Sequence, residues 1–146
     1  MSHASKSIDV DVAPEEFFAV LRDYASYPQF VPELRAVKVE RASGEAVEVT
    51  YWLDVTLKVF EFTLRHEANA RHDRIEWRLT RGGEFMRRNS GFWKLEKTAK
   101  GTRATYSIDI DFGPLVPVSF EKQLAERGLP NMLANFKARA ESLQRR

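Results

Sequence analysis

The chain contains no cysteine among its 146 residues. This absence excludes disulfide bonds, thiolate nucleophiles and cysteine-ligated metal sites. It is also typical of proteins of the reducing cytosol, and we therefore expect a cytoplasmic location. The first residues, MSHASKSIDVDV, contain no basic region followed by an apolar run, so we expect no signal peptide.

Long apolar runs and a strong charge of either sign are also missing. No apolar run approaches the roughly 20 residues that a membrane-spanning helix needs. The formal net charge is +2 and the pI is about 9.0. A DNA-binding surface usually shows a domain-wide excess of positive charge, and this mild bias does not predict a DNA partner.

Motifs for metal chemistry are absent, and we expect no metal site and no cofactor. The three histidines are His3, His66 and His72. His66 is followed by glutamate, as in zinc proteases, but the position four residues later is Ala70, so the second ligand is missing.

Motifs for nucleophilic or phosphate chemistry are equally scarce. The chain has no G-x-S-x-G, no P-loop and no G-x-G-x-x-G motif, and Gly82-Gly83 indicates a hairpin or bulge instead. The closely spaced carboxylates Asp109 and Asp111 alternate with apolar residues. Their spacing predicts a solvent-facing side of a strand rather than an acid/base pair.

The start of the chain predicts one strand and a short helical region. Alternation over Ser7–Val12 indicates a half-buried strand. Pro14 suits the first turn of a helix, and Pro28 ends that helix because the residue before a proline avoids helical angles. A short second turn fits before Pro32. The apolar stripe of the helix consists of Phe17, Leu21 and Tyr24.

From position 37 the pattern changes to alternation, which predicts antiparallel strands joined by tight turns. One strand face comprises Val47, Val49, Tyr51, Leu53 and Val55. The expected turns are Ser43-Gly44-Glu45, Arg71-His72-Asp73, Gly82-Gly83 and Lys100-Gly101. A helical period returns from about Val118 to Gln144, where Gly128 and Pro130 predict a bend near Leu129.

Aromatic side chains dominate the predicted interior, with 10 Phe, 4 Tyr and 3 Trp in the chain. A curved sheet around one long helix encloses a gap that either large side chains fill or a ligand occupies, and the sequence leaves both alternatives open. His66 is either a ligand-orienting group, together with Tyr51 or Arg81, or a core histidine with a partner. The predicted cavity-lining residues are Phe30, Tyr51, Phe60, Phe62, His66, Trp77, Arg81, Trp93, Tyr106, Phe120, Met132 and Phe136.

Four segments resemble a known superfamily: SYPQFVP (26–32), GFWKLE (91–96), YSIDIDF (106–112) and LPNMLANFKARAE (129–141). They are similar to the START and pollen-allergen superfamily, and within it to the polyketide cyclase/dehydrase group. This group includes coenzyme-Q-binding START-like proteins and ribosome-association toxins. The resemblance implies one α+β domain over residues 1–146 with the helix-grip fold. In that fold a curved antiparallel sheet of about seven strands surrounds a long C-terminal helix, and one or two short helices follow the first strand.

The resemblance implies three functions. The first is binding or transport of a small hydrophobic ligand, such as a polyprenyl quinone, a lipid or an aromatic polyketide. The second is a polyketide cyclase, aromatase or dehydrase activity. The third is contact with the ribosome, for which the candidate basic residues are Arg87, Arg88, Lys137 and Arg139.

Trp52 falls on the nominally polar face of its strand, beside Thr50 and Asp54. If exposed, it offers a contact for a dimer or a membrane. The alternative is cover by a neighbouring loop.

Overall fold

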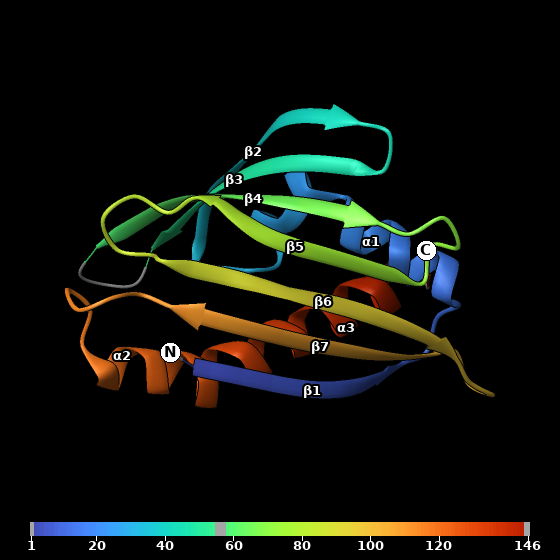
Figure 1. Ribbon diagram of the computed structural model, residues 1–146. Helices are drawn as coiled ribbons and strands as arrows, with labels where there is room; N and C mark the ends of the chain where they lie inside the picture. Colours follow the sequence, from blue (N-terminus) through green and yellow to red (C-terminus); the bar gives the residue numbers. More distant parts are fainter. Residues whose placement is uncertain (1, 55–57, 145–146) are drawn as a thin grey trace.

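The computed structural model describes residues 2–54 and 58–144 of the chain (Figure 1). Within these residues, seven strands form one sheet, accompanied by three α-helices and two shorter helical segments. The strands are β1 (Ser2–Val10), β2 (Leu34–Ser43), β3 (Ala46–Asp54), β4 (Val59–Ala68), β5 (Arg74–Arg81), β6 (Arg88–Lys97) and β7 (Thr102–Asp111). The helices are α1 (Pro14–Arg22), α2 (Val118–Gln123) and α3 (Leu129–Gln144), with a 3₁₀ helix η1 (Tyr24–Gln29) and a π-helical segment η2 (Leu124–Gly128).

The sheet is antiparallel throughout, with the strand order β1-β7-β6-β5-β4-β3-β2. Strands β2 to β7 follow one another as a meander, and β1 closes the far edge beside β7. Figure 1 shows α3 crossing behind β6 and β7, while β2 and β3 bend away from the rest of the sheet. This arrangement is the helix-grip fold that the sequence predicted, with its core between the sheet and α3.

The first strand differs from its prediction, because β1 spans Ser2–Val10 instead of Ser7–Val12. It pairs with β7 along its whole length, from Ser2 opposite Ile110 to Val10 opposite Thr102. Pairing with β7 therefore sets the length of β1. The alternation of apolar and polar residues indicates only the part of β1 that has one face toward the core. Val55, expected on a face of β3, lies outside the described residues.

The helical region after β1 begins and buries its stripe as predicted, but α1 ends at Arg22, well before Pro28. Helix α1 begins at Pro14, and its stripe of Phe17, Leu21 and Tyr24 is buried, with exposed fractions of 3% or less. The second turn is the 3₁₀ helix η1, which contains Pro28. The hydroxyl of Tyr27 in η1 donates to the carbonyl of Leu21, which fixes η1 against the end of α1.

The C-terminal helix bends close to the predicted position, by means of the π-helical segment η2. The N–H of Leu129 donates to the carbonyl of Leu124, five residues earlier, which widens this turn. Pro130 has no N–H to donate and cannot continue a regular ladder of hydrogen bonds. The predicted long helix is therefore three consecutive segments, α2, η2 and α3.

Polar contacts hold α3 across the sheet. The Lys137 Nζ donates to the carbonyl of Asp9 at 2.6 Å and to the carboxylate of Glu141 at 2.9 Å, while Glu141 accepts from the N–H of Asp11 at 3.0 Å. Along the same helix, Leu133, Phe136 and Ala140 are buried against the core. Among the described helices, none has the length and apolar character needed to cross a membrane.

Candidate functional site: an apolar cavity between the sheet and the helix

A cavity of about 180 Å³ lies between the inner face of the sheet and the C-terminal helix. The sheet supplies most of its aromatic wall, and η2 with the first turns of α3 supplies the opposite side. Most lining residues are buried, and those that are partly exposed mark the mouth of the cavity. They come from the β2–β3 pair and from the η2–α3 junction. They are Leu34, Leu53, Leu124, Gly128, Leu129 and Met132.

Trp77 forms part of the floor because Gly91 makes room for it. These two residues face each other across β5 and β6. A Cβ atom at Gly91 would lie 2.7 Å from a ring carbon of Trp77, so only glycine lets the indole cover this position. The indole N–H donates to Asn89 Oδ1 at 3.0 Å, and the indole stacks on Tyr106 with 5.2 Å between ring centroids.

A polar pair lies on this apolar surface. Neighbouring strands β3 and β4 carry Tyr51 and His66, and the Tyr51 hydroxyl and the His66 Nε2 are 2.7 Å apart. Burial lowers the pKa of His66 from 6.5 to about 3, with a smaller contribution from the charge of Arg22. Burial also raises the pKa of Tyr51 well above 10.0. Both groups are therefore neutral at pH 7.

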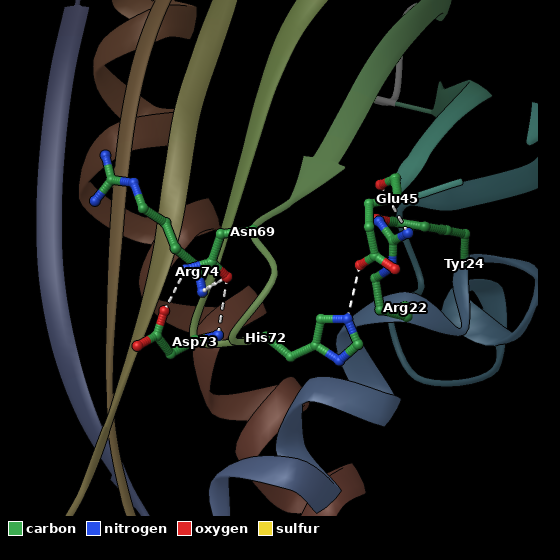
Figure 2. Close-up of polar contacts among 7 residues, drawn as sticks. All are labelled: Arg22, Tyr24, Glu45, Asn69, His72, Asp73 and Arg74. Carbon is green, nitrogen blue, oxygen red and sulfur yellow. Dashed lines mark hydrogen bonds and ion pairs between the residues drawn. The ribbon is translucent and has the colours of Figure 1, made fainter. Parts of the chain in front are cut away.

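The positive charge nearest to this pair is held outside the cavity. The guanidinium of Arg22 donates to the Tyr24 hydroxyl at 3.1 Å and to the carbonyl of Glu45 at 3.0 Å (Figure 2). Tyr24 lines the cavity, and its ring lies 4.6 Å from that of His66. Burial raises the pKa of Tyr24 to about 12, although Arg22 acts in the opposite direction. Tyr24 thus separates the guanidinium from the cavity.

A group of contacts at the surface, here called the surface clasp, joins the β4–β5 turn to α1 and to the start of β3 and consists of Phe18, Glu45 and His72. His72, in the β4–β5 turn, contacts the Glu45 carboxylate through Nε2 at 2.7 Å (Figure 2). The ring of His72 also stacks on Phe18 of α1, with 4.5 Å between ring centroids. In the same turn, Asn69 Oδ1 accepts from the backbone N–H groups of Asp73 and Arg74, both at 3.1 Å. Asn69 thus shapes the turn that presents His72 to α1.

Eight of the twelve predicted residues lie together in the cavity wall. They are Tyr51, Phe62, His66, Trp77, Trp93, Tyr106, Met132 and Phe136. The six strand residues among them face the interior because a strand presents alternate side chains to the helix, while Met132 and Phe136 come from α3. Their role in binding a ligand stays a prediction.

The other four predicted residues lie away from the cavity wall. Phe30 packs behind it, 5.0 Å from Phe136 between ring centroids. Phe60 and Phe120 belong to a separate cluster around Phe112, where β7 ends and α2 begins. Arg81 is exposed, its guanidinium donates to Thr63 Oγ1 at 3.3 Å, and it does not line the cavity.

Sequence reasoning missed several lining residues, of which Tyr24, Tyr27, Met86 and Asn89 are examples. Tyr24 was predicted to be buried in the stripe of α1, but nothing distinguished a cavity neighbour from a core residue. Tyr27 lies in η1, which begins before the turn that the sequence predicted from Pro28. Asn89 gave no sequence signal, because its position depends on the contact with Trp77.

The remaining candidates lie at the surface or are engaged by neighbouring residues. Arg139 donates to Gln29 Oε1 at 2.9 Å and lies over the ring of Phe30. Trp52 is half-buried, and its indole N–H donates to Glu61 at 2.9 Å. The described residues include no group of three or more His, Asp or Glu side chains placed to hold a metal ion.

The fold and the apolar cavity define a protein of the helix-grip class with an internal cavity. The chain belongs to the polyketide cyclase/dehydrase and lipid transport family, whose model matches residues 10–137. Among curated protein sequences, none matches the chain at a significant level.

Solved structures with the same fold come from several bacteria. The Zhui aromatase/cyclase from Streptomyces sp. R1128 is 19% identical, with a TM-score of 0.84 over 96% of this chain and 93% of that chain. A START superfamily protein from Mycobacterium smegmatis is 18% identical, with a TM-score of 0.83 over 97% and 98%. A STAR-related lipid transfer protein from Xanthomonas axonopodis is 16% identical, with a TM-score of 0.80 over 94% and 84%. At these identities the likeness shows the fold alone.

Proposed function

We propose that this chain binds a small hydrophobic ligand in the cavity between the sheet and α3, and acts as a carrier. The observation that supports this most directly is an apolar space left open in a core rich enough in aromatic side chains to fill it. Apolar burial supplies the binding energy, at roughly 25 cal/mol per Å² before the costs of ordering.

The size of the cavity favours a compact ligand. An engineered apolar cavity of about 150 Å³ binds benzene. The 180 Å³ here is therefore matched to a molecule of one or two rings. A quinone with a polyprenyl tail, or a lipid, would place its remaining carbons through the mouth between Leu34 and Met132.

A polyketide cyclase or dehydrase is the second candidate, because the Tyr51–His66 pair places two proton-carrying groups on the cavity wall. General acid/base catalysis works best when the pKa of the group lies near the working pH. The pKa of His66 is about 3, and that of Tyr51 is raised well above 10.0. Neither group therefore suits proton transfer at pH 7, which favours the carrier over the enzyme.

Ribosome contact is a third proposal and rests on Arg87, Arg88, Lys137 and Arg139. Lys137 is engaged by Glu141 and by the carbonyl of Asp9, which weakens its value as a contact. Binding through these residues predicts cosedimentation with ribosomal particles that falls steeply as salt rises. Absence of cosedimentation at low salt would remove this proposal.

Mass spectrometry of an organic extract tests the carrier proposal. The protein is purified from its own host, and the extract is compared with that of a Phe136→Asp variant purified in parallel. A stoichiometric apolar molecule present only with the unaltered protein supports the carrier. Equal recovery from both proteins would contradict the assignment of the ligand to this cavity. Turnover of the recovered molecule would favour the cyclase.

A further inference from the structure

The cavity wall carries a polar atom without a partner, at His66. Among the described residues, every side-chain nitrogen or oxygen that is sealed off from open space has a hydrogen-bond partner. The Nε2 of His66 has Tyr51, but its Nδ1 makes no hydrogen bond to any described residue. His66 is 6% exposed and lines the cavity, so the open space that Nδ1 meets is the cavity itself.

Counting hydrogens on the Tyr51–His66 pair gives the same result for either tautomer. A neutral phenol and a neutral imidazole carry one donor hydrogen each, and their mutual contact uses one of the two. If Tyr51 donates to Nε2, the Nδ1–H of His66 is left over. If Nε2–H donates to Tyr51, the phenol hydrogen is left over. One donor therefore remains for a ligand in both cases.

A second polar group without a partner lies nearby. The hydroxyl of Tyr106 makes no hydrogen bond within the described part of the chain, although Tyr106 is only 8% exposed and lines the cavity. Since the sealed-off polar atoms all have partners, this hydroxyl also faces the cavity. Tyr106 and His66 lie on the two sides of Trp77, with ring-centroid distances of 5.2 and 6.0 Å to its indole.

Within residues 2–54 and 58–144, no cation faces the cavity to receive a charged ligand. Among these residues, the single ionised side chain in the cavity wall belongs to the exposed Glu33, which is an acid. The guanidinium of Arg22 lies behind Tyr24, where it is bound to the Tyr24 hydroxyl and to a backbone carbonyl. A carboxylate or phosphate brought into this wall would lose its hydration without a counter-charge.

We infer that the cavity takes a neutral ring compound bearing a carbonyl or hydroxyl oxygen, and that the Tyr51–His66 pair holds this oxygen, with Tyr106 as a second donor. This inference rests on the proposed binding function and narrows its ligand class. It excludes long-chain carboxylates and lipids with phosphorylated headgroups as ligands. An unsubstituted hydrocarbon of the same size would bind, but would leave the donor of the pair unsatisfied.

Three probes of matched size test the inference at pH 7: naphthalene, α-tetralone and α-naphthoate, each measured by equilibrium dialysis. The unaltered protein is compared with the double variant Tyr51→Phe/His66→Phe, which replaces both partners by apolar rings of similar shape. The readout is the ratio of the naphthalene Kd to the tetralone Kd. Comparing this ratio between two proteins cancels the different water solubilities of the probes.

We expect the ratio to fall about fivefold to tenfold in the double variant, which corresponds to the loss of one hydrogen bond. The naphthoate should bind the unaltered protein at least a hundredfold more weakly than the tetralone. A His72→Phe variant makes the same histidine change in the surface clasp, where it keeps the stack on Phe18, and should leave the ratio unchanged.

The possible outcomes distinguish a failure of the oxygen-binding inference from a failure of the proposed ligand-binding function. Equal ratios in the unaltered protein and the double variant, with naphthalene still bound, would overturn the oxygen-binding role and leave the cavity as a ligand site. Tight naphthoate binding would overturn the neutral ligand class. If no probe binds, the proposed function falls as well. Should the double variant not fold, the imidazole NMR signals of His66 in the unaltered protein must move with tetralone and not with naphthalene.

Discussion

The buried histidine makes the stability of this protein depend on pH in a calculable way. The pKa of His66 is about 3 in the folded protein, against 6.5 for an ordinary histidine. Below pH 6.5 the imidazole of His66 is protonated in the unfolded chain, whereas in the folded chain it stays neutral down to about pH 3. The free energy of unfolding therefore falls by about 1.4 kcal/mol per pH unit in this window. At about pH 4.5, two units below 6.5, the loss amounts to roughly 3 kcal/mol.

Urea unfolding at about pH 7 and about pH 4.5 measures this loss, with the Tyr51→Phe/His66→Phe variant as the reference. Other titrating groups are common to both proteins, so the difference between the two pH dependences isolates His66. We expect the unaltered protein to lose roughly 3 kcal/mol more than the variant, out of a typical total of about 5–15 kcal/mol. Equal losses in the two proteins would refute the reasoning, because His66 would then accept its proton while folded.

Three further changes test the architecture. Gly91→Ala should lower the urea midpoint strongly, because its Cβ would lie 2.0 Å from the carbonyl oxygen of Ser107 and 2.7 Å from Trp77; an unchanged midpoint would contradict this packing. Phe136→Asp should abolish naphthalene binding in equilibrium dialysis and reduce stability by several kcal/mol, since it buries a carboxylate without a partner. Asn69→Ala should cost about 1–3 kcal/mol in urea unfolding, because two backbone N–H groups of the turn lose their acceptor, while naphthalene affinity stays the same.

Much of the fold could be predicted because its determinants are local. The stripe of Phe17, Leu21 and Tyr24 has helical spacing, and all three side chains are buried in α1 and at the start of η1. The bend in the C-terminal helix follows from Gly128 and Pro130, which disrupt regular helix wherever they occur. Alternation predicted the inward faces of the strands, and with them six of the residues that line the cavity.

The cavity itself could not be predicted, because it depends on distances between elements far apart in the chain. Phe60 and Tyr51 both have the inward-facing pattern of a strand residue. Phe60 joins a filled aromatic cluster with Phe112 and Phe120, whereas Tyr51 borders open space. Alternation gives the face of a side chain but not its depth under the helix. That depth is set by the register of the sheet and by the position of α3.

The chemistry of the site could also be predicted only in part, because the role of His66 depends on tertiary packing. The sequence presented His66 as either a ligand-orienting group or a core histidine with a partner. The structure shows the partner, because the Tyr51 hydroxyl lies 2.7 Å from Nε2, and a role in orienting a ligand stays a prediction. The pairing of β3 and β4 sets Val47 opposite His66 and Tyr51 four residues further along the strand, so that Tyr51 and His66 share one face of the sheet. A side chain in this cavity can bind a ligand only through donors and acceptors that have no partner within the protein. Which donors and acceptors these are depends on the folded sheet.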